Sequence, residues 1–244
     1  MTMSPDRLAA QLTASLHQDI DGLGVMPESP IGRRTQRRLI DVAEHAPPFI
    51  SLLVEPLLGD DADLSTLVQC ARVHLYARVL DDALDENLPL DRRNLLRIQP
   101  LFWHAVYTLA GRYPVQSEAS GLLMRDTIKA VELDDAQAHP GMWGQKNGHL
   151  LLAPLLLSGD SAAYRAALPG LMAVLAVAQA CEELEQGRVR TSALRDDLAT
   201  ALVKWLDAEM IVTLHQHGWH GAATRLLADG DMLLTRMRHL RVNP

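Results

Sequence analysis

The sequence predicts an all-α protein. Apolar residues recur at helical spacing through nearly the whole 244-residue chain, and strand-like alternation of β-branched residues is almost absent. Hydrophobic residues make up 48% of the chain, which is enough to build a substantial core. We therefore expect a bundle of roughly eight to ten helices.

The predicted helices follow one another from the start of the chain. A Ser-Pro-Asp sequence at residues 4–6 opens the first helix. Residues 33–45 form a polar helix that Pro47-Pro48 ends, and residues 48–58 form a short helix. The later predicted helices span residues 63–87, 91–112, 116–137, 144–158, 161–187, 192–217 and 220–240. Pro169-Gly170 predicts a kink inside one of them.

Composition predicts a single domain over residues 1–244, with residues 1–30 as a peripheral N-terminal segment, because no stretch resembles a linker. The formal net charge of −7 argues against a nucleic-acid-binding protein. Residues 1–19 lack the apolar segment of a secretory signal, and the apolar stretches 150–157 and 168–180 are too short or interrupted to span a bilayer. We therefore expect a cytoplasmic protein with reduced cysteines and no integral membrane segment. The sequence leaves a homodimer open.

The most informative motif is acidic, Asp81-Asp82-Ala83-Leu84-Asp85-Glu86, and it closes the largely apolar predicted helix 63–87. Asp81 and Asp85 are four positions apart, so their side chains share a face of the helix, and Asp82 flanks them. Converging carboxylates repel one another unless a cation lies between them, and hard oxygen ligands favour Mg²⁺. A solvated helix end is the alternative interpretation.

A second acidic cluster, Glu182 and Glu183, follows another apolar stretch. If the two acidic helices face each other, metal ions between them can bridge to an anionic ligand. Surface pairs with Arg188 are the alternative. Lys146 precedes the apolar stretch 150–157, where a cation beside free backbone N–H groups suits an anion. A snorkelling surface lysine is the alternative there.

These elements, in their order along the chain, resemble the class I isoprenoid synthase superfamily. Asp81-Asp82-xx-Asp85 matches its DDxxD motif, and Gly32-Arg33-Arg34 resembles the basic segment ahead of that motif. Lys146-Asn147-Gly148 and Gln179-xx-Glu182-Glu183 resemble the Lys-Thr-Gly and Gln-xx-Asp-Asp elements of prenyl diphosphate synthases. The resemblance covers residues 30–240 and implies an all-α, terpenoid synthase-like helical bundle around a central cavity.

The resemblance implies a Mg²⁺-dependent enzyme that ionises an allylic prenyl diphosphate and releases diphosphate. By motif match, the metal ligands would be Asp81, Asp82, Asp85, Glu182 and Glu183. The catalytic residues would be Asp81, Asp82 and Lys146, and the diphosphate-binding residues would be Lys146, Arg33 and Arg34. The substrate pocket would contain Tyr76, Phe102, Trp103 and Trp143, for which plain core packing is the alternative.

Four functions stay open at this point. The aromatic content of 4% favours simple chemistry on one prenyl diphosphate, as in a terpene synthase or lyase. The order of the motifs favours a prenyltransferase that couples two isoprenoid units. Glutamates where the second motif has aspartates would fit a non-catalytic partner subunit of the same fold. A helical regulatory or ligand-binding protein is the fourth class.

Overall fold

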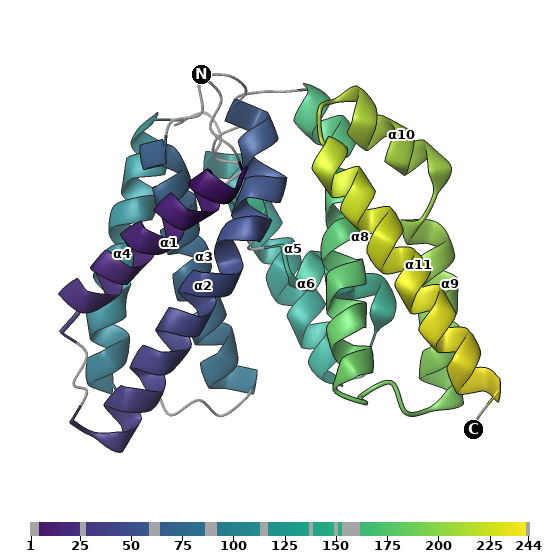
Figure 1. The fold of residues 1–244 in the computed structure, drawn as a ribbon, viewed down its shortest axis with the longest axis horizontal. Helices are drawn as coiled ribbons and strands as arrows, with labels where there is room; N and C mark the ends of the chain where they lie inside the picture. The colour runs from purple at the N-terminus through teal and green to yellow at the C-terminus, as the bar shows by residue number, and fades with distance from the viewer. Residues whose placement is uncertain are drawn as a thin grey trace. The chain divides into compact units, whose positions relative to one another are not determined.

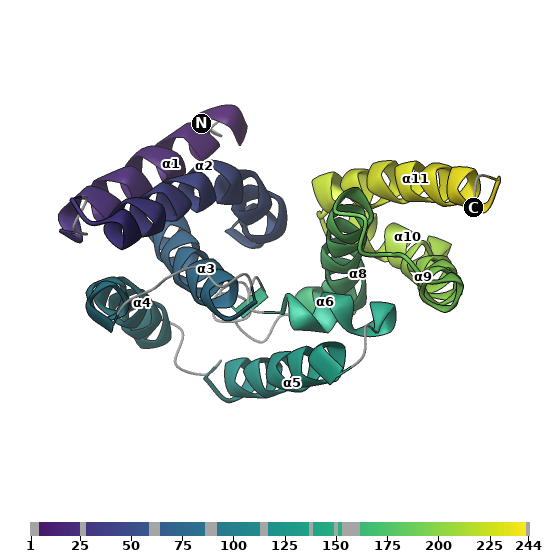
Figure 2. The same ribbon diagram turned by 90° about the horizontal axis from the view of Figure 1, so that it is seen from below.

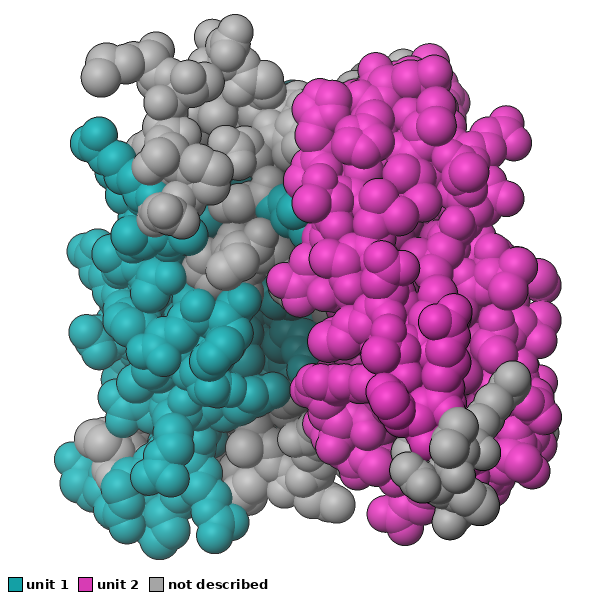
Figure 3. All heavy atoms as spheres, turned by 45° about the vertical axis from the view of Figure 1, so that its right-hand side comes forward, with its two compact units in different colours: residues 1–117 teal, residues 118–244 magenta. Residues whose placement is uncertain are grey.

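The computed structural model describes residues 5–24, 28–58, 64–85, 92–112, 117–136, 139–148, 151–152 and 162–242. Within these ranges all regular secondary structure is helical and no strand occurs, which confirms the all-α prediction (Figure 1). The chain divides into two compact units, residues 1–117 and 118–244 (Figure 3). The single-domain interpretation stays a prediction.

Unit 1 contains α1 (Pro5–Gly22), α2 (Pro30–Leu58), α3 (Leu64–Asp85) and α4 (Arg92–Arg112). α1 lies along α2, and α3 contacts α1, α2 and α4 (Figure 2). One face of α1 is fully buried, with Leu8, Leu12 and Leu16 at most 1% exposed. The segment predicted as peripheral thus contributes a complete helix to the core of unit 1.

A buried ion pair joins α1 to α3. The Arg72 guanidinium donates two hydrogen bonds to the Asp19 carboxylate, with N–O distances of 2.6 and 2.7 Å. Both side chains are less than one fifth exposed. Planar guanidinium and carboxylate groups match in this bidentate geometry, so the pair fixes the register of the two helices.

The prediction that Pro47-Pro48 ends a helix is wrong. α2 continues through both prolines to Leu58, so the two helices expected at 33–45 and 48–58 are one. Proline removes a backbone donor and normally interrupts a helix. Here Val42 and Ala43 before the prolines and Ile50 after them are all buried, so packing on both sides holds the helical course.

Unit 2 is built around α8 (Ala162–Glu185). Its other helices are α5 (Ser117–Ala136), the 3₁₀ helix η3 (Pro140–Met142), α6 (Trp143–Lys146), α9 (Ser192–Trp205), α10 (Ala208–Gln216) and α11 (His220–Val242). α8 contacts α6, α9, α10 and α11. α6 and α8 are in close backbone contact at Gly144. A Cβ atom on this residue would lie 2.5 Å from the backbone oxygen of Met172. Only glycine permits this backbone contact without a shift.

Two predicted helices of unit 2 are interrupted. The helix expected at 144–158 breaks after Lys146, where Asn147 and Gly148 form a turn; residues 153–158 lie outside the described residues. The helix expected at 192–217 breaks at Asp207, whose carboxylate accepts a hydrogen bond from the Glu209 N–H at 2.7 Å. This N-cap starts a new helix, which the apolar spacing alone did not indicate.

One described stretch, Tyr164–Glu185 in α8, is long and apolar enough to cross a membrane by length and composition alone. A buried core helix passes the same test. Leu171, Val174 and Val177 in this stretch are each at most 2% exposed within unit 2. The absence of an integral membrane segment stays a prediction.

Candidate functional site

The acidic motif lies at the C-terminal end of α3. The backbone is helical through Asp85, as predicted, while Glu86 and the side chains of Asp81, Asp82 and Asp85 lie outside the described part of the structure. Earlier in the same helix, Val73, Leu75 and Val79 are buried. The motif therefore completes a core helix, and the convergence of its carboxylates stays a prediction.

The basic segment predicted to bind diphosphate lies near the start of α2. Arg33 and Arg34 are both exposed, and Arg33 donates a hydrogen bond to the Glu28 carbonyl oxygen at 2.8 Å. α2 and α3 run in opposite directions, so the start of α2 and the end of α3 lie at the same end of unit 1 (Figure 1). Cationic side chains and the acidic motif therefore belong to the same end of one unit.

Three of the four predicted pocket aromatics lie together in unit 1. Tyr76 stacks on Phe102 with ring centroids 4.6 Å apart, and Phe102 meets Trp103 edge-on at 5.3 Å. Trp103 is half exposed and stacks on Tyr107 at 5.9 Å. Trp143 belongs to unit 2, where it is buried against Trp205 with centroids 6.4 Å apart.

Lys146 forms a largely buried ion pair in unit 2. Its Nζ atom lies 3.0 Å from Oδ2 of Asp134, and the side chains are 15% and 13% exposed. Oδ1 of Asp134 accepts hydrogen bonds from the Trp143 indole at 3.0 Å and from the His139 backbone N–H at 3.1 Å. Asp134 therefore ties α5 to η3 and α6, a role that no sequence pattern indicated because its partners lie on both sides of the Pro140-Gly141 break.

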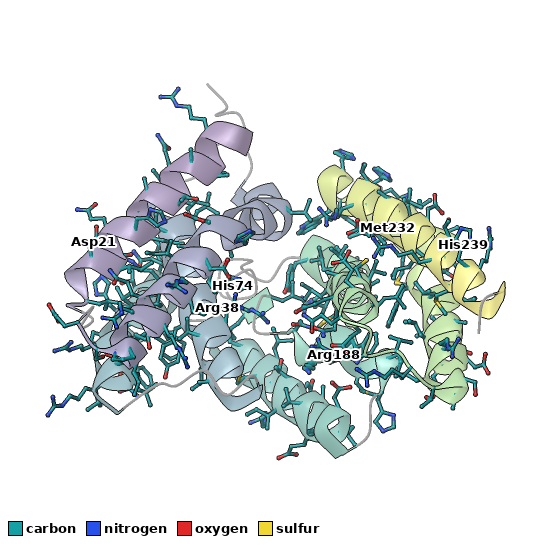
Figure 4. The ribbon with its side chains drawn as sticks, turned by 60° about the horizontal axis from the view of Figure 1, so that its bottom comes forward. Asp21, Arg38, His74, Arg188, Met232 and His239 are labelled. Carbon is teal, nitrogen blue, oxygen red and sulfur yellow. The ribbon has the colours of Figure 1, made fainter. Side chains whose placement is uncertain are left out.

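The second acidic cluster belongs to a hydrogen-bonded chain at the end of α8. Gln179 accepts a hydrogen bond from Asn147 at 3.3 Å and donates one to Glu183 at 2.6 Å. Both carboxylate oxygens of Glu183 accept from Arg188, at 2.6 and 2.7 Å; Arg188 is labelled beside the end of α8 in Figure 4. Glu182 accepts from Gln186 at 3.1 Å.

This series of hydrogen bonds connects two of the elements on which the family resemblance depends. The Lys146-Asn147-Gly148 element and the Gln179-xx-Glu182-Glu183 element are joined directly through the side chains of Asn147 and Gln179. Glu183, however, already has its charge compensated by Arg188. Its two oxygens accept three hydrogen bonds from Gln179 and Arg188, so a Mg²⁺ ion at Glu183 would compete with these donors, and its role as a metal ligand stays a prediction.

A cavity of about 430 Å³ lies within unit 2, between α5, α6, α8, α9 and α10. Its walls are mainly apolar and include Met172 and Trp205, while Asp126 and Lys204 are the charged residues that line it. Thr127 also lines it, and its hydroxyl is buried without a hydrogen-bond partner among the described residues. Such a cavity suits a mainly apolar ligand with one polar group.

Among the described residues, no group of three or more His, Cys, Asp or Glu side chains is placed to hold a metal ion. The carboxylates of the α3 motif are outside that description. Comparison with protein-family models, with curated proteins and with solved structures found no match to this chain.

Proposed function

We propose that this protein is a class I isoprenoid synthase-like enzyme, with a terpenoid synthase-like bundle, that ionises an allylic prenyl diphosphate and releases diphosphate. The observation that carries the proposal is the acidic motif itself. Asp81, Asp82 and Asp85 end a helix whose preceding turns are buried in the core of unit 1. A rigid helix end with three carboxylates is a suitable support for a hard divalent cation.

Each proposed residue has a distinct role. The three aspartates would hold Mg²⁺, which when bound stabilises the negative charge that develops on the leaving diphosphate. Arg33 and Arg34, exposed at the same end of unit 1, would bind diphosphate oxygens through charge-assisted hydrogen bonds. The stacked rings of Tyr76 and Phe102 would offer aromatic faces to a carbocation.

Two residues of unit 2 would have to exchange partners to take part. Lys146 would leave Asp134 to reach a diphosphate oxygen, and Glu183 would leave Arg188 to reach a metal ion. Each exchange separates a formed ion pair, which costs free energy that substrate binding must offset. The proposed metal site therefore rests on the α3 aspartates alone.

The test is incubation of the full chain with C10, C15 and C20 prenyl diphosphates in Mg²⁺, with and without isopentenyl diphosphate. Released diphosphate and organic products are measured. Asp81→Ala and Asp82→Ala should abolish release and leave the helical circular-dichroism signal unchanged. Asp21→Ala is the matched control, because Asp21 is an exposed aspartate on α1 that is not part of the motif (Figure 4). Wild-type rates in both motif variants would show that the motif is not the catalytic site.

The same experiment separates the alternatives. Products that form only with isopentenyl diphosphate would identify a prenyltransferase, which the direct Asn147–Gln179 contact favours. Binding of a prenyl compound without turnover would identify a ligand-binding protein, which the mainly apolar cavity beside Thr127 favours. A non-catalytic partner subunit would be inactive alone. The Glu183–Arg188 ion pair favours this alternative, because it occupies a carboxylate that an active enzyme would use for metal.

A further inference from the structure

Two histidine rings converge where α10 passes into α11. His215 lies in the last turn of α10, and His220 is the first residue of α11. Their Nδ1 atoms are 3.1 Å apart, and the ring centroids are 5.4 Å apart with planes inclined by 34°. Both residues are exposed.

The turn between the two histidines is held firmly. Gly218 has a φ of +89°, a left-handed conformation that favours glycine. Trp219 is 1% exposed, its backbone N–H donates to the Leu214 carbonyl oxygen at 2.9 Å, and its ring packs against Tyr164. The anchored turn fixes the backbone that carries the two exposed imidazoles.

The nitrogen separation fits a shared metal ion. Imidazole nitrogens bind Zn²⁺ at about 2.0–2.1 Å, so two of them on one ion lie about 2.9 Å apart at a right angle and about 3.3 Å apart at the tetrahedral angle. The observed 3.1 Å lies between these values. The centroid separation of 5.4 Å equals the nitrogen separation plus one ring radius on each side, so the two Nδ1 atoms point straight at each other, as in a hydrogen bond. Each exposed ring therefore has to turn to direct its lone pair at a shared ion. Metal binding requires both rings to carry their proton on Nε2. A single proton shared between the two Nδ1 atoms is the competing arrangement.

We infer that His215 and His220 form a two-histidine site for a transition-metal dication such as Zn²⁺, Ni²⁺ or Cu²⁺, with water in the remaining positions. Imidazole ligands select these ions, whereas carboxylates select Mg²⁺. The site is therefore chemically distinct from the α3 motif and independent of the proposed enzyme activity. Because its ligands come from two helices, bound metal would clamp the end of α10 to the start of α11.

The test is a Zn²⁺ titration of the untagged full chain by competition with a chromophoric chelator, in excess Mg²⁺ so that carboxylate sites are occupied. We expect one equivalent of Zn²⁺ and a rise in the melting temperature on binding. His215→Gln and His220→Gln should each weaken binding at least tenfold. His217→Gln is the matched control, because His217 is exposed in the same turn. His239→Gln, toward the other end of α11, is a second control (Figure 4).

A spectroscopic readout identifies the ligands directly. The electron paramagnetic resonance spectrum of the Cu²⁺-loaded protein should show coupling to two imidazole nitrogens in the wild type. It should show one in His215→Gln or His220→Gln. Absence of Zn²⁺ binding would mean that the rings share a proton, and binding unchanged in both variants would place the metal elsewhere. Either result overturns the inference, as does loss of binding in His217→Gln alone.

Discussion

Replacement of Asp134 by alanine removes the acceptor for three donors at once. Trp143 loses the acceptor of its indole N–H, His139 loses the acceptor of its backbone N–H, and Lys146 loses the carboxylate that pairs with its ammonium group. Trp143 is 2% exposed and the Lys146 side chain 15% exposed, so water cannot readily replace the carboxylate at either group. The change should therefore destabilise unit 2 strongly.

The size of the destabilisation follows from the donor groups that lose the Asp134 carboxylate. A buried donor without an acceptor costs about 1–3 kcal/mol. Removal of one member of a buried ion pair costs about 3–5 kcal/mol, because the other charge stays behind. These two costs overlap in one network, so we expect Asp134→Ala to lower the free energy of unfolding by about 3–5 kcal/mol. Asp134→Asn keeps an acceptor for Trp143 and should cost about 1–3 kcal/mol.

Urea unfolding followed by tryptophan fluorescence measures this loss. Trp143, Trp205 and Trp219 belong to unit 2, so the signal reports mainly on the unit that contains Asp134. The double variant Asp134→Ala/Lys146→Met removes both charges of this ion pair, and at least about 1.5 kcal/mol should be recovered. A loss below about 1 kcal/mol in Asp134→Ala would refute the reasoning and would leave Lys146 available to bind diphosphate.

Two further predictions concern close packing and thiol chemistry. Gly144→Ala should lower the free energy of unfolding by about 1–3 kcal/mol in the same urea assay, because its Cβ would meet the Met172 carbonyl oxygen. Gly121→Ala, on open helix surface, should raise it by about 0.5–1 kcal/mol. Equal effects of the two substitutions would contradict the packing argument. Burial, aided by the charge of Asp229, raises the pKa of Cys181 from 9.0 to about 11. Iodoacetamide should therefore alkylate Cys181 slowly at pH 8, with a rate that rises about tenfold per pH unit toward pH 11 rather than levelling near pH 9. The pKa of the Cys181 thiol is higher in the folded than in the unfolded protein. The contribution of Cys181 to the free energy of unfolding is therefore fully present below pH 9 and is lost as pH rises through 11.

Helical periodicity was sufficient to predict most elements of the fold. The predicted helices 91–112, 116–137 and 220–240 agree with α4, α5 and α11 to within two residues. The predicted helix boundaries were wrong where a local sequence signal and the packing of the helix disagree. The prolines at 47–48 do not end α2, because both flanks of the helix are buried. Asp207 ends one helix and starts another through a cap that apolar spacing cannot indicate.

The sequence motifs predicted which helix carries the acidic residues but not which side chains pair with one another. The apolar residues before Asp81 predict a helix that the motif closes, and the structure has a helix there that ends at Asp85. The pairing of Lys146 with Asp134 depends on how the chain turns back at η3. The convergence of His215 and His220 depends on a five-residue separation across a turn, which matches no helical period.

The ion pair between Asp19 and Arg72 has a consequence for how the chain is made. The two residues are 53 positions apart. At a synthesis rate of about 5–20 residues per second, α1 waits roughly 3–10 s on the ribosome before its partner in α3 exists. During that interval the stripe formed by Leu8, Leu12 and Leu16 has only α2 to cover it. The apolar stripe of α1 is therefore fully covered only after α3 has been made.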